Sequence, residues 1–285
     1  MSSLLAEARL RFHSALQASF LTVNASGVPS NADKDSTLSV ALARGIFSRL
    51  GLGAISPRVA GQTLGNQFEL LCESFLKETF TELKHLRPGN WVIQCVGGRN
   101  RAEIARYEQY AHNAVLDQMS RENLALRVAL GSDYLISPDL VIARLPEPDE
   151  YLNSPFALVD ETVAQHASLR FTANARPILH ASISCKWTIR SDRAQNARSE
   201  ALNLVRNRKG HLPHITVITG EPLPSRIASL ALGTGDIDCV YHVTLPELIA
   251  SVEAGNYEDA RELLEIMVSG KRLKDIADLP LDLAV

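Results

Sequence analysis

The chain has 285 residues, of which 46% are hydrophobic and 21% are charged, so it can bury a sizeable core as one large domain or two small ones. Its formal net charge of -3 argues against a protein that coats nucleic acid without regard to sequence, because binding of that kind needs clustered Lys and Arg. The charge does not exclude a local basic cleft, since carboxylate groups elsewhere lower the total.

The cysteines and the N-terminal segment predict a cytoplasmic protein. The 4 cysteines lie far apart, without a C-x-x-C pair, and each falls within an apolar run, which is typical of buried thiols in a reducing compartment. Residues 4–21 carry charged residues within an apolar periodicity, which favours an amphipathic helix over a signal peptide. We expect no transmembrane span and no membrane partner.

Helical and extended segments are expected to alternate along the chain. Helices are expected over residues 1–21, 38–50, 62–86, 100–130, between 159 and 178, over 193–209, from about 225, and over 246–254 and 257–268. Extended segments are expected over residues 91–96, 139–143, 156–159, 178–189, 214–219 and 236–245. This order predicts an α/β fold with a central mixed β-sheet flanked by helices, in a single domain that covers residues 1–285.

One run, residues 180–193, organises the rest of the chain. From residue 183 to residue 189 apolar and polar residues alternate, which is the period of a half-buried strand. Lys186 is expected on the polar face, and Arg190 on the same face about 13 Å further along, at roughly 3.3 Å per residue. Ser191 suits the N-cap of the following helix, which can return Glu200 to the level of Lys186 if it packs back along the strand.

A second carboxylate comes from upstream. Asp139 follows Pro138 at the start of an apolar strand, where a proline is tolerated. A lysine and two carboxylates brought together are the parts of a metal-assisted phosphodiester hydrolase. This order of Pro-Asp, a small-x-Lys strand and a helix with Glu resembles the PD-(D/E)xK nucleases. The plainer alternative is an edge-strand Lys186 in a surface ion pair with Glu200.

The Arg-Ser-Asp-Arg run at residues 190–193 narrows this resemblance. With Lys186 before it and Glu200 after it, the stretch resembles the NgoMIV-type restriction endonucleases, tetrameric type II enzymes that recognise CCGG. The resemblance spans nearly the whole chain and is strongest over residues 131–144, 180–213, 231–242 and 270–285. It implies a restriction-endonuclease-like core and magnesium-dependent cleavage of double-stranded DNA.

The resemblance also implies a catalytic centre. Asp139 and Glu200 would be the carboxylate ligands of Mg²⁺, with two ions per active site, and the backbone carbonyl of Cys185 would be a third ligand. Lys186 would orient the attacking water and stabilise the developing negative charge. Ser184 occupies a place where many relatives carry an acid, so the missing charge must come from Glu200.

Two further residues of the family pattern lie on the helix expected over residues 62–86. Glu69 would be an additional acidic residue near the metal ions, and Gln62 would contact the minor groove. The alternative for Glu69 is a glutamate at the solvent edge of its helix, beside Phe68. The alternative for Gln62 is an ordinary polar residue at a helix N-terminus.

The expected DNA contacts combine arginines with aspartates. Arg190 and Arg193 can each grip guanine O6 and N7, and Asp192 can accept from cytosine N4 amines, which covers a C-C-G-G half-site. By resemblance, Arg226 reads the outer guanine and Asp33, in an Asn-Ala-Asp loop, reaches the outer base pair. The alternative for the first three residues is a surface salt-bridge cluster. The alternatives for Arg226 and Asp33 are a lone surface arginine and a turn-forming aspartate.

A palindromic site demands a two-fold protein. The resemblance extends this to a homotetramer that binds two sites, with GCCGGC as the target, cut as G/CCGGC to leave four-base 5′ ends, and it implies a cognate DNA methyltransferase in the same system. Two other functions stay open. A sequence-specific DNA-binding regulator would leave the lysine and both carboxylates without a purpose, and a repair nuclease of the same superfamily would cut without regard to CCGG.

Overall fold

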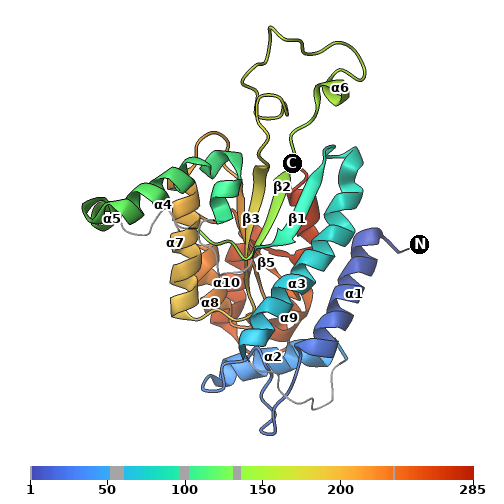
Figure 1. Cartoon of the computed structure of the whole chain (residues 1–285). Helices are drawn as coiled ribbons and strands as arrows, with labels where there is room; N and C mark the ends of the chain where they lie inside the picture. Colours follow the sequence, from blue (N-terminus) through green and yellow to red (C-terminus); the bar gives the residue numbers. More distant parts are fainter. Residues whose placement is uncertain (1, 52–60, 97–102, 131–135, 234) are drawn as a thin grey trace. The chain divides into compact units, whose positions relative to one another are not determined.

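The computed structural model describes residues 2–51, 61–96, 103–130, 136–233 and 235–285 (Figure 1). The chain forms two compact units, which are described in turn. The first comprises Met1–Leu83, Ser184–Arg198 and Ile215–Val285, and the second comprises Lys84–Ile183 and Ser199–His214. The strand order is β1-β2-β3-β4-β5-β6, antiparallel from β1 to β3 and parallel from β4 to β6. This mixed sheet with helices confirms the predicted α/β class.

The second unit holds the antiparallel strands β1 (Trp91–Cys95), β2 (Leu140–Arg144) and most of β3 (Ile178–Lys186). The first four residues of β2 are all buried, as expected of a short apolar run with neighbours on both sides. The register between β2 and β3 shifts once, between Ile142 and Ala143. The strand predicted over residues 139–143 is therefore confirmed within one residue.

The helical residues of the second unit fall into short helices. The helical stretch predicted over residues 100–130 is divided, in its described part, into η2 (Glu103–Arg106), η3 (Glu108–Tyr110), α4 (His112–Glu122) and α5 (Leu124–Leu130). The break has a tertiary cause. Gln109 is buried and its side-chain amide donates to the carbonyl of Leu179 at 2.8 Å and accepts from its N–H at 2.9 Å, which fixes η3 against the start of β3.

After α6 (Asp149–Leu152), the predictions for residues 156–177 are wrong. This described segment contains turns and one isolated bridge, from Glu147 to Arg170, in place of the expected extended piece and helix. Arg170 is 6% exposed and its guanidinium donates to both carboxylate oxygens of Asp149, at 2.7 and 2.6 Å, and to the carbonyl of Val163 at 2.7 Å. The segment is therefore held in place by these polar contacts and not by the apolar face that a packed helix would need.

The first unit holds the parallel strands β5 (Cys239–His242) and β6 (Leu273–Asp275) and all but the first residue of β4 (His214–Thr219). Parallel neighbours need long connections, and here α8 (Pro224–Ala231) joins β4 to β5, while α9 (Leu245–Glu253) and α10 (Glu258–Ser269) join β5 to β6. The chain ends in η4 (Ile276–Asp278) and α11 (Leu279–Asp282). Strand β4 occupies the same six residues as predicted.

The N-terminal part of the first unit contributes α1 (Leu4–Ser19), α2 (Thr37–Arg49) and α3 (Gly61–Thr79), and the shorter η1 (Phe80–His85) follows. Helix α1 packs on α3, where the rings of Phe12 and Phe75 meet at 5.4 Å, and α2 packs on α9. Arg9 of α1 pairs with Glu247 at 2.7 Å and with Asp275 at 2.9 Å. The helix predicted over residues 62–86 is thus an α-helix followed by a 3-10 turn.

The strand that carries the predicted lysine ends earlier than expected. β3 stops at Lys186, and α7 (Ser191–Asn207) begins five residues later, so the placement of Arg190 on the strand face is wrong. Ser191 is the first helical residue and not the N-cap, because the carbonyl of Arg190 accepts the bond from the N–H of Ala194 at 2.9 Å. The chain leaves the strand because Trp187 turns away to pack on two buried phenylalanine rings, at 5.5 and 5.3 Å.

No helix among the described residues is long and apolar enough to cross a membrane.

Candidate functional site

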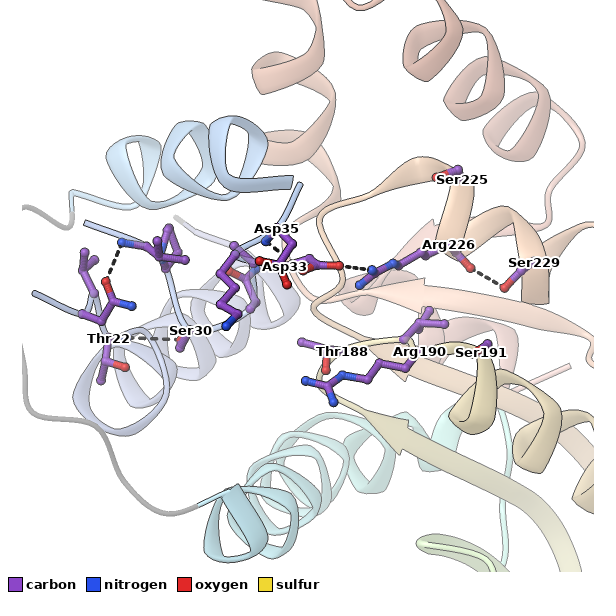
Figure 2. Close-up of a pocket in the computed structure, with 18 residues that line it drawn as sticks. Thr22, Ser30, Asp33, Asp35, Thr188, Arg190, Ser191, Ser225, Arg226 and Ser229 are labelled. Atoms are coloured by element: carbon purple, nitrogen blue, oxygen red, sulfur yellow. Dashed lines mark hydrogen bonds and ion pairs between the residues drawn. The ribbon is translucent and has the colours of Figure 1, made fainter. Parts of the chain in front are cut away.

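A hollow of about 910 Å³ lies in the first unit, and three stretches of chain line it (Figure 2). They are the loop between α1 and α2, the connection from β3 to α7, and the first turns of α8. The lining residues fall at 22–24, 28–35, 188–191, 225, 226 and 229. The hollow therefore gathers Asp33, Arg190 and Arg226, three of the residues predicted to contact DNA.

The α1–α2 loop is shaped by its own polar side chains. The Oδ1 of Asn24 accepts hydrogen bonds from two backbone N–H groups at 3.0 and 2.9 Å, and Gly27 with φ +73° allows the tight turn. Asn31 is 3% exposed and its Nδ2 donates to the carbonyl of Gly220 at 2.8 Å. The loop is thereby attached to the residue that follows β4.

Asp33 and Arg226 form an ion pair across the hollow, as Figure 2 shows. The backbone N–H of Asp35, which donates to Asp33 at 3.1 Å, and the Arg226 guanidinium hold the pKa of the Asp33 carboxyl below its usual range. Arg226 lies in the first turn of α8, where the helix dipole disfavours a cation, and the facing carboxylate offsets that cost. Asp33 therefore forms the turn that was its alternative interpretation, since its carboxylate accepts from the N–H of the residue two positions on, and it also pairs with Arg226, which is not a lone surface arginine.

A buried carboxylate stands behind the hollow. Glu221 is 0% exposed, and its Oε2 accepts from the N–H of Ile189 at 2.8 Å while its Oε1 accepts from the N–H of Leu223 at 3.1 Å. The NH1 of Arg226 lies 3.9 Å from the same Oε2. Burial raises the pKa of Glu221 to about 7, against the opposing effect of the two N–H donors and the arginine.

The three charged residues at 190–193 do not form the surface salt-bridge cluster that was the alternative interpretation. All three are exposed, and among the described residues no ion pair joins Asp192 to either arginine. Arg190 lines the hollow, whereas the NH1 of Arg193 donates back to the carbonyl and the hydroxyl of Thr188, at 3.3 and 3.1 Å. Asp192 and Arg193 lie in the first turn of α7, next to the hollow in sequence but outside its lining.

The residues predicted for catalysis are distributed over both units. In the second unit, Asp139 is half-buried directly before β2, where its carbonyl accepts from the N–H of Val96 at 3.0 Å, and Glu200 is half-buried on α7. In the first unit, Ser184 and Lys186 are half-buried at the end of β3.

The other two residues of that set also lie in the first unit. Cys185 is buried on β3, between Ser184 and Lys186, and Glu69 is half-buried on α3 beside the buried Phe68. The alternation from residue 183 to residue 186 is thus confirmed, while the joint position of the six residues stays a prediction.

The described side chains do not test the predicted metal site or the predicted minor-groove contact. Within the described ranges, no group of three or more His, Cys, Asp or Glu side chains is placed to hold a metal ion. The predicted ligand set of two carboxylates and one backbone carbonyl is smaller than such a group. Gln62 lies at the start of α3, in a stretch whose side chains fall outside the described part of the chain.

Sequence reasoning missed Glu221 and Trp187 as parts of this site, and it placed Asn31 in the Asn-Ala-Asp loop without predicting that Asn31 is buried. A glutamate before Pro222 has the pattern of an exposed turn, and an asparagine in a polar loop has no pattern that marks burial. Gly220 carried a usable signal, since a glycine directly after an apolar strand indicates a close approach. A Cβ on Gly220 would overlap the ring of Trp187.

Three comparisons with known proteins bear on this chain. By structure, it aligns with the crystal structure of the Type IIF restriction endonuclease Bse634I with cognate DNA, at a TM-score of 0.37 and 13% identity, over 90% of this chain and 92% of that one. By sequence, it is 56% identical over 286 residues to the type II restriction enzyme NgoMIV of Neisseria gonorrhoeae, covering 100% of both chains. The model of the NgoMIV restriction enzyme family matches residues 12–285. The chain therefore belongs to the NgoMIV family of type II restriction enzymes.

Proposed function

We propose that this type II restriction enzyme cleaves double-stranded DNA at the palindromic site GCCGGC, after the first G, and leaves four-base 5′ ends. The observation that carries this proposal is the hollow in which Arg190, Arg226 and Asp33 meet. Guanidinium groups match guanine O6 and N7 in the major groove, and a carboxylate matches the cytosine N4 amine. Two arginines and an aspartate in one hollow therefore suit G·C pairs.

The residues proposed to contact bases fall into two groups, one for the outer base pair and one for the inner CCGG. Arg226 and Asp33, already paired with each other, would read the guanine and the cytosine of the outer pair. Arg190, Asp192 and Arg193, at the start of α7, would read the inner CCGG. The exposure of these three residues supports this role, because a base edge can reach them. Gln62, at the start of α3, would add a minor-groove contact.

The cleavage chemistry is assigned to a second set of residues. The oxygen atoms of Asp139 and Glu200 and the carbonyl of Cys185 are the ligand type that Mg²⁺ prefers, and they would hold two ions per active site. The bound metal would supply an activated water and charge stabilisation at the scissile phosphate. Lys186 would orient that water and stabilise the phosphate charge with its ammonium group. Its half-buried position at the end of β3 supports this role.

Ser184 and Glu69 complete the set. Ser184 points to the same strand face as Lys186, because side chains two residues apart on a strand share a face. Its hydroxyl can donate to a ligand but brings no charge, so the second carboxylate comes from Glu200 on α7. Glu69 on α3 would add negative charge near the metal ions.

The partners follow from the site. A palindrome presents the same edges twice, which a two-fold symmetric protein matches. We propose a homotetramer, a dimer of dimers that binds two sites, together with a cognate DNA methyltransferase that protects the host site. A cytoplasmic location suits a DNA enzyme, and it is supported by the 4 cysteines, all within the described ranges, none of which forms a disulfide bond.

Digestion of DNA of known sequence tests this function. Purified protein incubated with plasmid and MgCl₂ should cut at GCCGGC, and sequencing of the ends should show four-base 5′ extensions. Binding without cutting in the presence of MgCl₂ would support a DNA-binding regulator instead. Cutting at sites without CCGG would support a repair nuclease.

One variant separates catalysis from recognition. Lys186→Ala should lose cleavage while it still shifts a GCCGGC duplex in a gel, because the lysine acts on the phosphate and not on the bases. Lys209→Ala, which removes an exposed lysine, is the matched control and should cut normally. Cleavage at the normal rate by Lys186→Ala would overturn the mechanism.

A further inference from the structure

We infer that Glu221, to which the proposed function gives no contact with DNA, is a positioning residue that sets Arg190 and Arg226 for reading the site. The inference rests on the proposed function, in which these two arginines contact guanines. It adds a residue behind the hollow on which the accuracy of reading depends.

The backbone of Glu221 is fixed on both sides. Its N–H donates to the Oγ1 of Thr219 at 3.2 Å, and its carbonyl lies 3.0 Å from the Nε2 of His242. Burial lowers the pKa of His242 to about 4, so near neutral pH the ring is uncharged, and its Nε2–H donates this bond while Nδ1 accepts from the N–H of Thr244 at 3.1 Å. The carboxylate of Glu221 therefore projects from a rigid point at the end of β4.

The carboxylate contacts both segments that carry the arginines. Oε2 accepts from the N–H of Ile189, the residue before Arg190, and Oε1 accepts from the N–H of Leu223, the N-cap residue of α8. Arg226 is three residues further on, and its guanidinium faces the carboxylate at 3.9 Å. One side chain thus links the connection from β3 to α7 with the start of α8.

These contacts require two acceptor oxygens. A glutamine offers one acceptor, so its amide group would face the second N–H donor-to-donor. An apolar side chain would fill the space but leave both N–H groups buried without a partner. Burying a carboxylate is unfavourable in itself, so its presence at 0% exposure indicates a role that packing alone does not explain.

A double-mutant cycle tests the inference. The variants Glu221→Gln, Arg226→Ala and the double variant are compared on a GCCGGC duplex and on a duplex with a changed outer base pair, and the ratio of the two cleavage rates is the readout. Glu221→Gln should lower this ratio about tenfold, the size of one lost base contact. In the Arg226→Ala background it should lower the ratio no further, because Glu221 acts on the outer pair through Arg226, and any effect through Arg190 falls on the inner CCGG that both duplexes share. Additive losses would indicate a general structural effect and overturn the inference.

The effect of Arg226→Ala on the ratio distinguishes a failure of the inference from a failure of the proposed function. If Arg226→Ala leaves the ratio unchanged, the proposed reading of the outer pair is wrong. If Arg226→Ala lowers the ratio and Glu221→Gln does not, the positioning role is wrong. Glu253→Gln, the same change at an exposed position, is the control and should leave the ratio unchanged.

A second measurement covers the case in which Glu221→Gln does not fold. The charged groups that face Glu221 are Arg226 from α8 and Asp33 from the α1–α2 loop, and the nearest histidine, His242 on β5, is uncharged. Loss of the negative charge on Glu221 below about pH 7 should therefore lower the wild-type ratio between pH 8 and pH 6. In Arg226→Ala the ratio should not change with pH. A flat wild-type profile would overturn the inference.

Discussion

Asn31 and Gly220 are joined by a hydrogen bond of 2.8 Å from the side-chain Nδ2 to the backbone carbonyl oxygen, and Asn31 is 3% exposed. Asp33 lies two residues further along the same loop, so this bond is one of the contacts that place its carboxylate at the hollow, together with the bond from the N–H of Asp33 to the hydroxyl of Ser39 at 2.9 Å and the ion pair with Arg226. Gly220 also donates its N–H to the carbonyl of Trp187 at 3.1 Å. The residue after β4 therefore holds two of the three stretches that line the hollow.

The first prediction concerns this bond. Asn31→Ala should lower the free energy of unfolding by about 1–3 kcal/mol, because it leaves the buried Gly220 carbonyl without its donor. It should also reduce discrimination at the outer base pair, because the loop that carries Asp33 loses its bond to Gly220. Urea unfolding and cleavage of matched duplexes measure the two effects. Asn256→Ala, at an exposed position, should change neither, and a stable Asn31→Ala with full discrimination would contradict the prediction.

The second prediction contrasts two glycines. Gly220→Ala should lower the free energy of unfolding by about 1–3 kcal/mol, since the new methyl group overlaps the Trp187 ring. Gly65→Ala lies on helix α3 with nothing within 4 Å of the new Cβ, and it should raise the free energy by about 0.5–1 kcal/mol. Thermal unfolding of both variants gives the comparison. Equal effects of the two substitutions would show that the Trp187 contact is not tight.

The third prediction concerns pH. The folded-state pKa of Glu221 is raised to about 7 from an ordinary value of 4.5, so the folded protein binds this proton more tightly than the unfolded chain does. This group's contribution to stability is therefore greatest below pH 4.5 and declines as pH rises to about 7, by about 3 kcal/mol at roughly 1.4 kcal/mol per pKa unit.

Glu221→Gln has no titrating group at this position and provides the measurement. The difference in free energy of unfolding between wild type and Glu221→Gln should shift against the wild type between pH 5 and pH 8, because every other group titrates in both proteins. Urea unfolding at several pH values gives that difference. Parallel curves for the two proteins would rule out the raised pKa.

The fourth prediction concerns Arg193, whose guanidinium donates to Thr188 and pairs with no carboxylate of the described residues. Arg193→Ala should therefore change the free energy of unfolding by less than about 0.5 kcal/mol, as exposed substitutions usually do. It should weaken binding to the CCGG site by about 1–3 kcal/mol if it grips a guanine. Gel-shift titration without added metal measures the affinity. Arg261→Ala, in an exposed pair with Glu258, is the control, and equal affinities of the two variants would refute the guanine contact.

The sequence predicted those elements whose pattern is local. Strand β4 was placed to the residue, because six apolar-rich residues are bounded by Pro213 and Gly220. The ion pair of Asp33 and Arg226 joins two residues that the family resemblance had placed on the same base pair. Neither residue could have been assigned from its own loop or helix start, where turn formation and surface charge are equally compatible with the sequence.

The errors arose where long-range contacts override local pattern. The alternation of polar and apolar residues continues to Ile189, but the backbone leaves β3 after Lys186, because the ring of Trp187 and the N–H of Ile189 find their partners at Phe20, Phe68 and Glu221. Those partners are distant in sequence, so no window around residue 187 contains the information. For the same reason Glu221 could not be recognised as part of the site before its surroundings were known.

The pairing of Asp33 with Arg226 has a consequence for how the free enzyme scans DNA. A backbone phosphate offers oxygen acceptors only, so it can bind the arginine but has no hydrogen-bond donor for the aspartate. A G·C pair offers acceptors to the arginine and an amine to the aspartate, so both groups exchange one partner for another of matching chemistry. On the proposed function, breaking the ion pair is therefore unfavourable when the DNA offers only a backbone phosphate. It is offset by new hydrogen bonds to both side chains when the DNA offers the correct base pair.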